Sequence, residues 1–65
     1  MQNYIVTFTD GTIWQKAFMK MDDMIHSSMF VRIVKDDKIY MVNKSTIKTV
    51  AVIVTGKRYY VILHD

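Results

Sequence analysis

With 65 residues, the chain is long enough for one domain and too short for two. It has no cysteine, so neither a disulfide nor a thiolate metal site supplies extra stability. Nine Lys and Arg against six acidic residues give a formal charge of +3, which attracts nucleic acid or an acidic protein face only weakly. We therefore expect residues 1–65 to form a single domain, stabilised by dense apolar packing or by a second subunit.

The first hairpin is predicted from the Asp10-Gly11 pair, which lies between β-rich runs within residues 4–17. Asp-Gly favours a two-residue type I′ turn, because both central residues of that turn need a positive φ. The turn places Phe8 opposite Ile13 on the core face of the hairpin. Trp14 then falls on the more polar face.

Residues 18–28 are the helix candidate. Phe18, Met21 and Met24 follow the spacing of one helical face, and the acidic pair 22–23 suits a first turn. We predict a helix of one or two turns that crosses from one sheet edge to another. Met21 and Met24 are expected to fill the core, and Met19 is expected to contribute to an adaptable surface.

Two further hairpins are predicted in the second half of the chain. Residues 30–34 and 39–42 flank a polar turn at 35–38. Polar residues 43–46 then suggest a single 3₁₀ turn. Residues 47–54 and 59–63 form the last strand pair, for which Gly56-Lys57 suits a type II′ turn.

Six short strands and one brief helix predict a mostly β fold of the α+β class. We expect a small, curved antiparallel sheet or a partly open barrel of the SH3-like or Sm-like kind. An open sheet that dimerises is the alternative.

The last strand pair is apolar on both faces, which is unusual for a sheet that meets water on one side. One face is covered by the first two hairpins and the helix. The other face is left uncovered, and it carries Ala51, Ile53, Tyr60 and Ile62. A two-fold interface would cover these residues, so we predict a homodimer that uses them for self-association.

Nothing in the sequence predicts catalysis, a cofactor or a metal site. His26 and His64 are too far apart for a metal-ligand motif, and the chain has no Glu, no Cys and no glycine-rich phosphate loop. The longest apolar run, residues 50–54, is far shorter than the ~18 residues of a membrane helix. We expect a cytoplasmic protein that is not an enzyme and has no membrane partner.

Two sets of residues are candidates for binding a partner. Lys57, Arg58, Tyr59 and Tyr60 combine cations with aromatic rings, a pattern that suits phosphate clamping and base stacking as well as a strand core. Trp14, on the more polar face of its hairpin, is typical of an anchor in a protein interface. A basic strip of Lys44, Lys48, Lys57 and Arg58 would favour nucleic acid, and an apolar patch around Trp14 would favour protein.

The order of the turn 9–12, a short helix, the strand 30–32 and the segment 40–48 resembles the LytTR-type DNA-binding domain. The resemblance covers about the first three quarters of the chain. The family's His-Arg-Ser stretch is replaced here by residues 35–38, and its later Ser-Arg element has no match. No DNA-contacting residue is therefore carried over to this chain.

We interpret the sequence as a non-enzymatic interaction module that binds a macromolecule. A Lys-rich composition with few Arg and no Pro fits a small bacterial or phage protein that regulates or inhibits a host protein by binding it. A protein partner is favoured. A small barrel that binds nucleic acid is the alternative.

Overall fold

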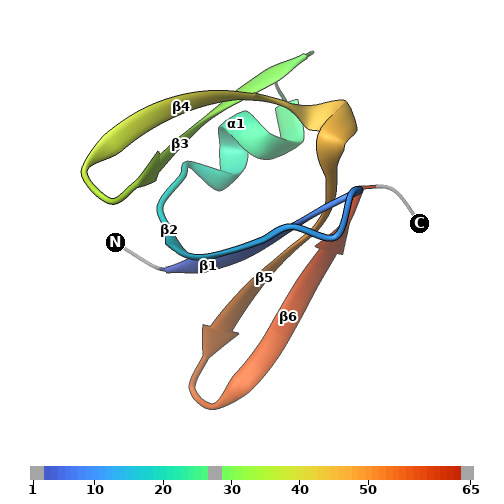
Figure 1. The fold of residues 1–65 in the computed structure, drawn as a ribbon. Helices are drawn as coiled ribbons and strands as arrows, with labels where there is room; N and C mark the ends of the chain where they lie inside the picture. The colour runs from blue at the N-terminus through green and yellow to red at the C-terminus, as the bar shows by residue number, and fades with distance from the viewer. Residues whose placement is uncertain (1–2, 27–28, 64–65) are drawn as a thin grey trace.

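A computed structural model describes residues 3–26 and 29–63 of the chain. Six strands dominate these residues, together with one α-helix and one 3₁₀ turn (Figure 1). Their bounds are β1 Tyr4–Phe8, β2 Ile13–Ala17, α1 Met21–His26, β3 Phe30–Lys35, β4 Lys38–Asn43, η1 Lys44–Thr46, β5 Ile47–Val54 and β6 Lys57–Ile62. The mostly β fold class predicted from the sequence is confirmed.

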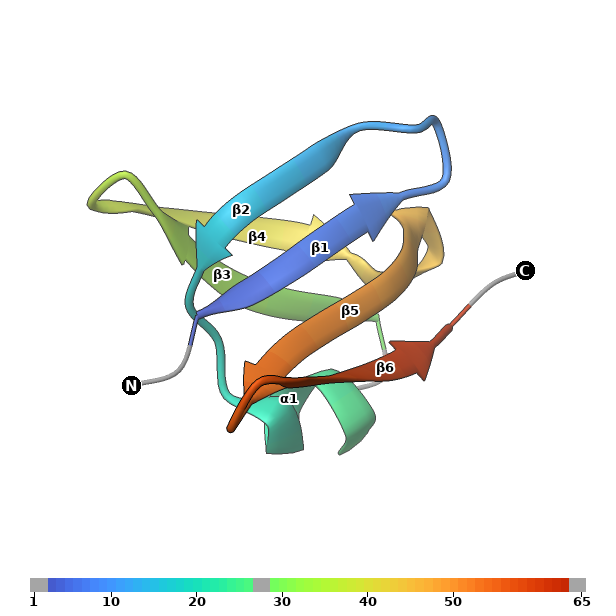
Figure 2. The same cartoon turned by 90° about the horizontal axis from the view of Figure 1, so that it is seen from below.

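The strands form two antiparallel sheets. The larger has the order β2-β1-β5-β6, and the smaller is the β3–β4 hairpin, which lies across it (Figure 2). Backbone hydrogen bonds between Phe18 and Val34 link the segment after β2 to β3, at 2.9 Å in both directions. Within the residues that the structure describes, no strand pairing closes the sheets into a barrel. The fold is therefore the open, curved form of the predicted architecture.

The core lies between the two sheets and is closed at one side by α1. Its largest fully buried side chains are Met24, Ile33, Ile47, Val6, Val31 and Val50. Met24 is the buried residue of the helix, as the helical spacing predicts. Met19 is also buried, at 8% exposure, so its predicted place on an adaptable surface is wrong. It enters the core because the segment between β2 and α1 runs along the edge of β3.

The first hairpin has a longer turn than predicted. The Phe8 N–H donates to the Thr12 carbonyl at 2.8 Å, and the Gly11 N–H donates to the Phe8 carbonyl at 3.0 Å. Gly11 has a φ of 93°, so the loop is a type I turn followed by a bulge at glycine. The Asp10 carboxylate accepts a hydrogen bond from the Thr12 N–H, which lowers the pKa of Asp10. This side-chain bond stabilises the three-residue loop.

The extra loop residue changes which side chains face the core. Thr7 pairs with Ile13 and Val6 pairs with Trp14, whereas the sequence predicts Phe8 opposite Ile13. A shift of one residue exchanges the two faces of a strand. Ile13 is therefore 58% exposed, and Trp14 packs against the core. The predicted placement of Trp14 on the more polar face is wrong.

The helix is shorter than predicted. It begins at Met21, because Phe18 forms a bridge with Val34 and so stays extended. Backbone pairing with a distant strand thus overrides a helical spacing of apolar residues, which is a weak local preference. The predicted end of the helix, at Ser27-Ser28, lies outside the described residues.

The second hairpin has the predicted register. Ile33 pairs with Tyr40 and Val31 pairs with Val42. Only Asp36-Asp37 lies between the strands, with φ values of 53° and 62°. Two residues of positive φ make a type I′ turn, whose backbone twist matches that of the flanking strands.

This turn provides a test of backbone strain. We expect Asp37→Gly to stabilise the protein by about 0.5 kcal/mol, because relief of a left-handed conformation outweighs the flexibility that glycine adds to the unfolded chain. Urea unfolding measures the change. The matched control is Asp23→Gly in α1, where glycine should instead cost roughly 0.6–1.3 kcal/mol, because it has a lower helix propensity than aspartate and the acidic group is lost from the first turn. Destabilisation by both variants would contradict this account of the turn.

The third hairpin turns one residue earlier than predicted. Thr55 and Gly56, with φ values of 52° and 79°, occupy the turn, and Val54 pairs with Lys57. The turn is therefore of type I′, and the predicted type II′ turn at Gly56-Lys57 is wrong. Lys57 and Arg58 are consequently strand residues, and each has its side chain on a defined face of the hairpin.

Candidate functional site

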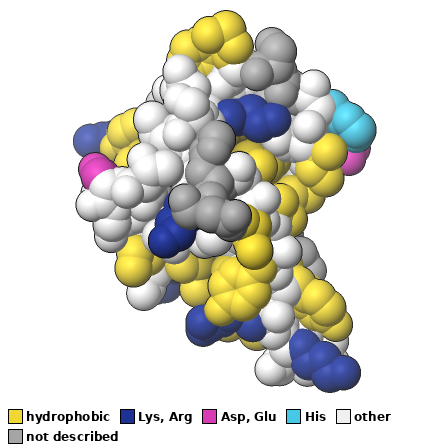
Figure 3. All heavy atoms as spheres, turned by 90° about the vertical axis from the view of Figure 1, so that its right-hand side faces the viewer, with side chains coloured by type: hydrophobic (Ala, Val, Ile, Leu, Met, Phe, Trp, Pro, Cys, Tyr) yellow, Lys and Arg dark blue, Asp and Glu magenta, His cyan; other side chains and the backbone are white. Residues whose placement is uncertain are grey.

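The β5–β6 hairpin projects from the body of the molecule. Its turn points away from α1 and from the β3–β4 hairpin (Figure 1). The base of the hairpin belongs to the core through Val50, whereas Ile53 near the turn is 53% exposed. We call residues 52–62 of this hairpin the arm. Hydrophobic and basic side chains meet at its end, the lower end of the molecule in Figure 3.

The arm presents different side chains on its two faces. Pairing of Val54 with Lys57 and of Val52 with Tyr59 places these four residues on the face that continues into the core. Tyr59 on this inner face is 54% exposed, because the arm extends beyond the elements that cover the core.

The outer face of the arm is formed by the alternate residues of the same register. Ile53 pairs with Arg58, Ala51 pairs with Tyr60, and Thr49 pairs with Ile62. The Arg58 Nη1 donates to the Tyr60 Oη at 3.2 Å, so cation and phenol lie side by side. The outer face is therefore an apolar surface with one fixed cation at its end.

The predicted self-association residues do share this outer face. Ile53, Tyr60 and Ile62 are 53%, 56% and 65% exposed. Ala51 is only 4% exposed, because it lies between Ile5 of β1 and Tyr60 of β6. Ala51 therefore has almost no exposed surface that a partner could contact.

The arm belongs to the cationic half of the chain. Residues 38–63 contain five Lys or Arg and no Asp or Glu, whereas residues 1–37 contain five Asp and four Lys or Arg. Among the described residues, the recorded ion pair joins Lys35 to Asp36, at 3.5 Å and outside the arm. The net charge of +3 is therefore distributed unevenly, with the excess of positive charge in residues 38–63.

The predicted basic strip is not continuous. Lys44 belongs to η1 and Lys48 lies at the base of β5, whereas Lys57 and Arg58 lie at the other end of the hairpin. Five residues of strand separate Lys48 from Ile53, the neighbour of Arg58, which corresponds to about 16 Å. Lys57 and Arg58 also point to opposite faces.

Trp14 lies apart from the arm. Its strand is the opposite edge of the sheet, three strand spacings or about 14 Å from β6. Its ring contacts Phe8 at 4.8 Å and Tyr40 at 5.1 Å between centroids. The structure therefore brings four of the five predicted partner-binding residues together and places the fifth in an aromatic cluster between the two sheets.

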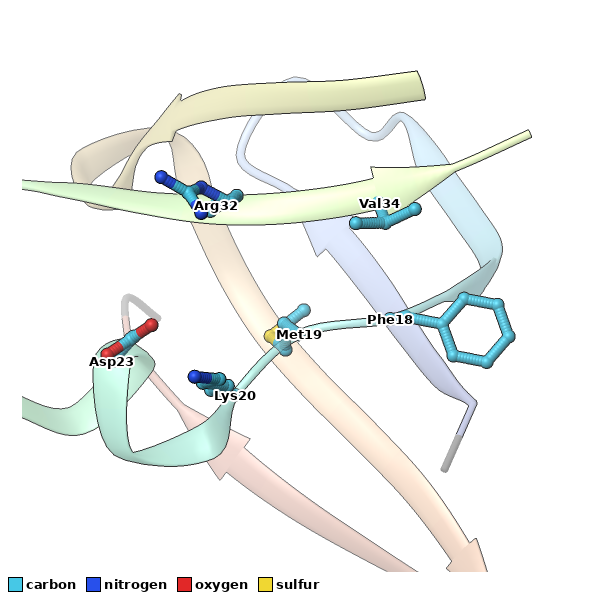
Figure 4. Close-up of a pocket in the computed structure, with 6 residues that line it drawn as sticks. All are labelled: Phe18, Met19, Lys20, Asp23, Arg32 and Val34. Carbon is cyan, nitrogen blue, oxygen red and sulfur yellow. The ribbon is translucent and has the colours of Figure 1, made fainter. Parts of the chain in front are cut away.

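A small cavity of about 170 Å³ lies between β3 and the start of α1 (Figure 4). Its charged side chains are Lys20, Asp23 and Arg32, all exposed. Lys20 and Arg32 are of the type that binds an anion, but Asp23 lies beside them and no buried polar group anchors a ligand. The sequence gives no sign of this cavity, because the bridge between Phe18 and Val34 creates it.

Residues 3–26 and 29–63 form neither a metal-binding cluster nor a membrane-spanning helix. No group of three or more His, Cys, Asp or Glu is arranged to hold a metal ion within these ranges. His26 is exposed at the end of α1. No helix in this part of the chain has the length and apolar character needed to span a membrane.

Comparison with known proteins adds no assignment to this geometry. No family model, no curated protein and no solved structure matches the chain.

Proposed function

We propose that the protein is a non-enzymatic interaction module that binds another protein through the arm. The observation that carries this proposal is the exposure of Tyr59 and Tyr60 beside Lys57 and Arg58 on a projecting hairpin. Tyrosine and arginine are enriched among residues that dominate binding energy at interfaces. The small size and the composition support a bacterial or phage protein that regulates or inhibits a host protein by binding it, and a cysteine-free chain fits the cytoplasm.

The charge of the arm suggests the chemistry of the partner. Residues 38–63 contain no Asp or Glu, so neither strand of the arm supplies a carboxylate to pair with Lys57 or Arg58. Opposite charge on a partner accelerates encounter and fixes orientation. The proposed partner is therefore a protein with an acidic rim around an apolar pocket that accepts Tyr59.

Nucleic acid is the second candidate, and one observation favours it. Each face of the arm carries one cation and one tyrosine, Lys57 with Tyr59 and Arg58 with Tyr60. This arrangement suits a phosphate contact next to a stacked base. Only two cations lie at the tip, however, so counterion release would give a shallow salt dependence, with a slope of about −1.4 for a single strand.

The test is capture from a lysate of the organism that encodes the protein, with and without nuclease. We expect the wild type to capture a protein partner, and this capture should persist after nuclease treatment. The Tyr59→Ala variant should no longer capture the partner, and neither should the double variant Lys57→Ala/Arg58→Ala. The matched control is Lys38→Ala, which removes an exposed cation from the other sheet. Binding to purified partner should weaken by on the order of 2 kcal/mol for Tyr59→Ala.

Loss of all captured material after nuclease treatment would move the assignment to nucleic acid. Retention of the partner by both arm variants, with Lys38→Ala also unchanged, would show that the arm is not the binding site.

A further inference from the structure

The outer edge of β6 is an unpaired edge of the sheet. Val54 and Lys57 flank a two-residue turn and form a hydrogen-bonded pair, so bonding to β5 continues at every second residue. The Leu63 N–H, which donates to the Lys48 carbonyl at 2.9 Å, follows the same alternation. The backbone groups of Arg58, Tyr60 and Ile62 therefore point away from β5, where the sheet has no further described strand.

This edge lacks the features that usually block strand addition. Proteins protect edges with proline, bulges or charges along the strand. The chain has no proline, and the β5–β6 register runs through six consecutive pairs without a bulge. Lys57 and Arg58 place charge at one end only, so the part of the edge from Tyr59 to Ile62 remains open and uncharged.

We propose that a second copy of the chain pairs with this edge, β6 against β6 in antiparallel orientation, with the two-fold axis at Tyr60. The pairing would join two four-stranded sheets into one of eight strands and place the two apolar outer faces side by side as one continuous surface. The pairing leaves Lys57 and Tyr59 of the proposed partner site accessible on the inner face, whereas Arg58 and Tyr60 lie in the paired edge. The two Tyr60 side chains would lie next to each other on the outer face, across the two-fold axis.

Charge selects this register. With Tyr60 at the axis, Arg58 lies opposite the partner's Ile62, and the two Arg58 side chains are four residues or about 13 Å apart along the strands. That separation exceeds the Debye length of about 8 Å at physiological salt, so their repulsion is largely screened. A register centred on Arg58 would place like charges directly opposite one another, which is destabilising.

Hydrogen bonding supports the same choice. Three outward-facing residues, Arg58, Tyr60 and Ile62, form a self-complementary row under the two-fold operation. Each Arg58 also comes diagonally next to the partner's Tyr60, where a cation–π contact replaces part of the water that it loses.

Disulfide trapping tests the register, because the natural chain has no cysteine to compete. Across a hydrogen-bonded antiparallel pair the two Cα atoms are about 5.5 Å apart, within the range that a disulfide spans. We expect Tyr60→Cys to form a covalent dimer under mild oxidation. Arg58→Cys should not, since its copies lie about 13 Å apart, and neither should Ile39→Cys on the outer face of the other sheet.

Sedimentation equilibrium at micromolar concentration tests the dimer itself. The wild type should show twice the 7.7 kDa mass of one chain. Ile62→Lys, which faces the partner's Arg58, should be monomeric, and the double variant with Arg58→Glu should dimerise again through two opposite-charge pairs. Ile39→Lys is the control and should stay dimeric; circular dichroism confirms folding of each variant.

A monomeric wild type overturns the proposal, as does a dimer of Ile62→Lys. Faster crosslinking of Arg58→Cys than of Tyr60→Cys would overturn the register and the proposal with it. None of these outcomes depends on the capture experiment, so failure of the dimer and failure of the proposed function are distinguishable.

Discussion

Replacing Ile33 by alanine is expected to lower the free energy of unfolding by about 3 kcal/mol. Ile33 has no exposed surface and lies at the centre of the core, and loss of three buried carbon atoms at such a site typically costs 2–5 kcal/mol. A domain of this length has a total stability of roughly 3–10 kcal/mol. The variant should therefore lose a large part of its stability, with Tm lower by roughly 12–24 °C.

Ile39→Ala is the matched control for this prediction. Ile39 lies on the same hairpin with its side chain 64% exposed on the outer face. Its truncation removes little buried area and should change stability by less than about 0.5 kcal/mol. Thermal unfolding of both variants, followed by circular dichroism, compares them. Equal effects of the two substitutions would contradict the placement of the core.

Trp14→Ala is expected to cost about 3 kcal/mol of stability, the low end of the range for large aromatic residues because Trp14 is half-buried. Its ring lies between Phe8 of the larger sheet and Tyr40 of the smaller one. The truncation therefore separates two layers as well as opening a cavity. Ile13→Ala, at a neighbouring position with 58% exposure, is the control and should have a small effect.

A double-mutant cycle with Trp14→Ala and Tyr40→Ala measures the contact directly. Aromatic pairs of this geometry contribute about 0.5–1.5 kcal/mol beyond area burial. The sequence also predicts that Trp14→Ala weakens protein binding by on the order of 2 kcal/mol. Trp14→Phe separates the two roles, because it keeps most of the packing. Additive effects of the two alanine substitutions would show that the rings do not stabilise the fold together.

The sequence predicts the strands well, and the turns between them less well. The Asp36-Asp37 turn can be predicted because two apolar runs, residues 30–34 and 39–42, lie symmetrically on both sides of it. At Asp10-Gly11 the same logic fails by one residue, because the Asp10 carboxylate bonds to the Thr12 N–H and favours a longer loop. At Gly56 a glycine suits either turn position, and only pairing of Val54 with Lys57 decides between them.

Interactions between distant segments account for the other differences. No local signal shows that Phe18 meets Val34, so a helical spacing of apolar residues extends the predicted helix too far. The residues of the arm are recoverable from composition alone, since cations, tyrosines and two apolar faces occur together there. Their division between an inner and an outer face requires the register of the third hairpin.

The pairing of β1 with β5 has a consequence for how the chain folds. Val6 in β1 lies opposite Val50 in β5, so pairing at the centre of the larger sheet closes a loop of more than forty residues. Such non-local pairing slows folding relative to helical proteins of the same length. During synthesis the first hairpin stays without its neighbouring strand until β5 has been made and has left the ribosome. Because residues 1–65 contain no proline, folding of this domain should lack the slow phase that prolyl isomerisation causes.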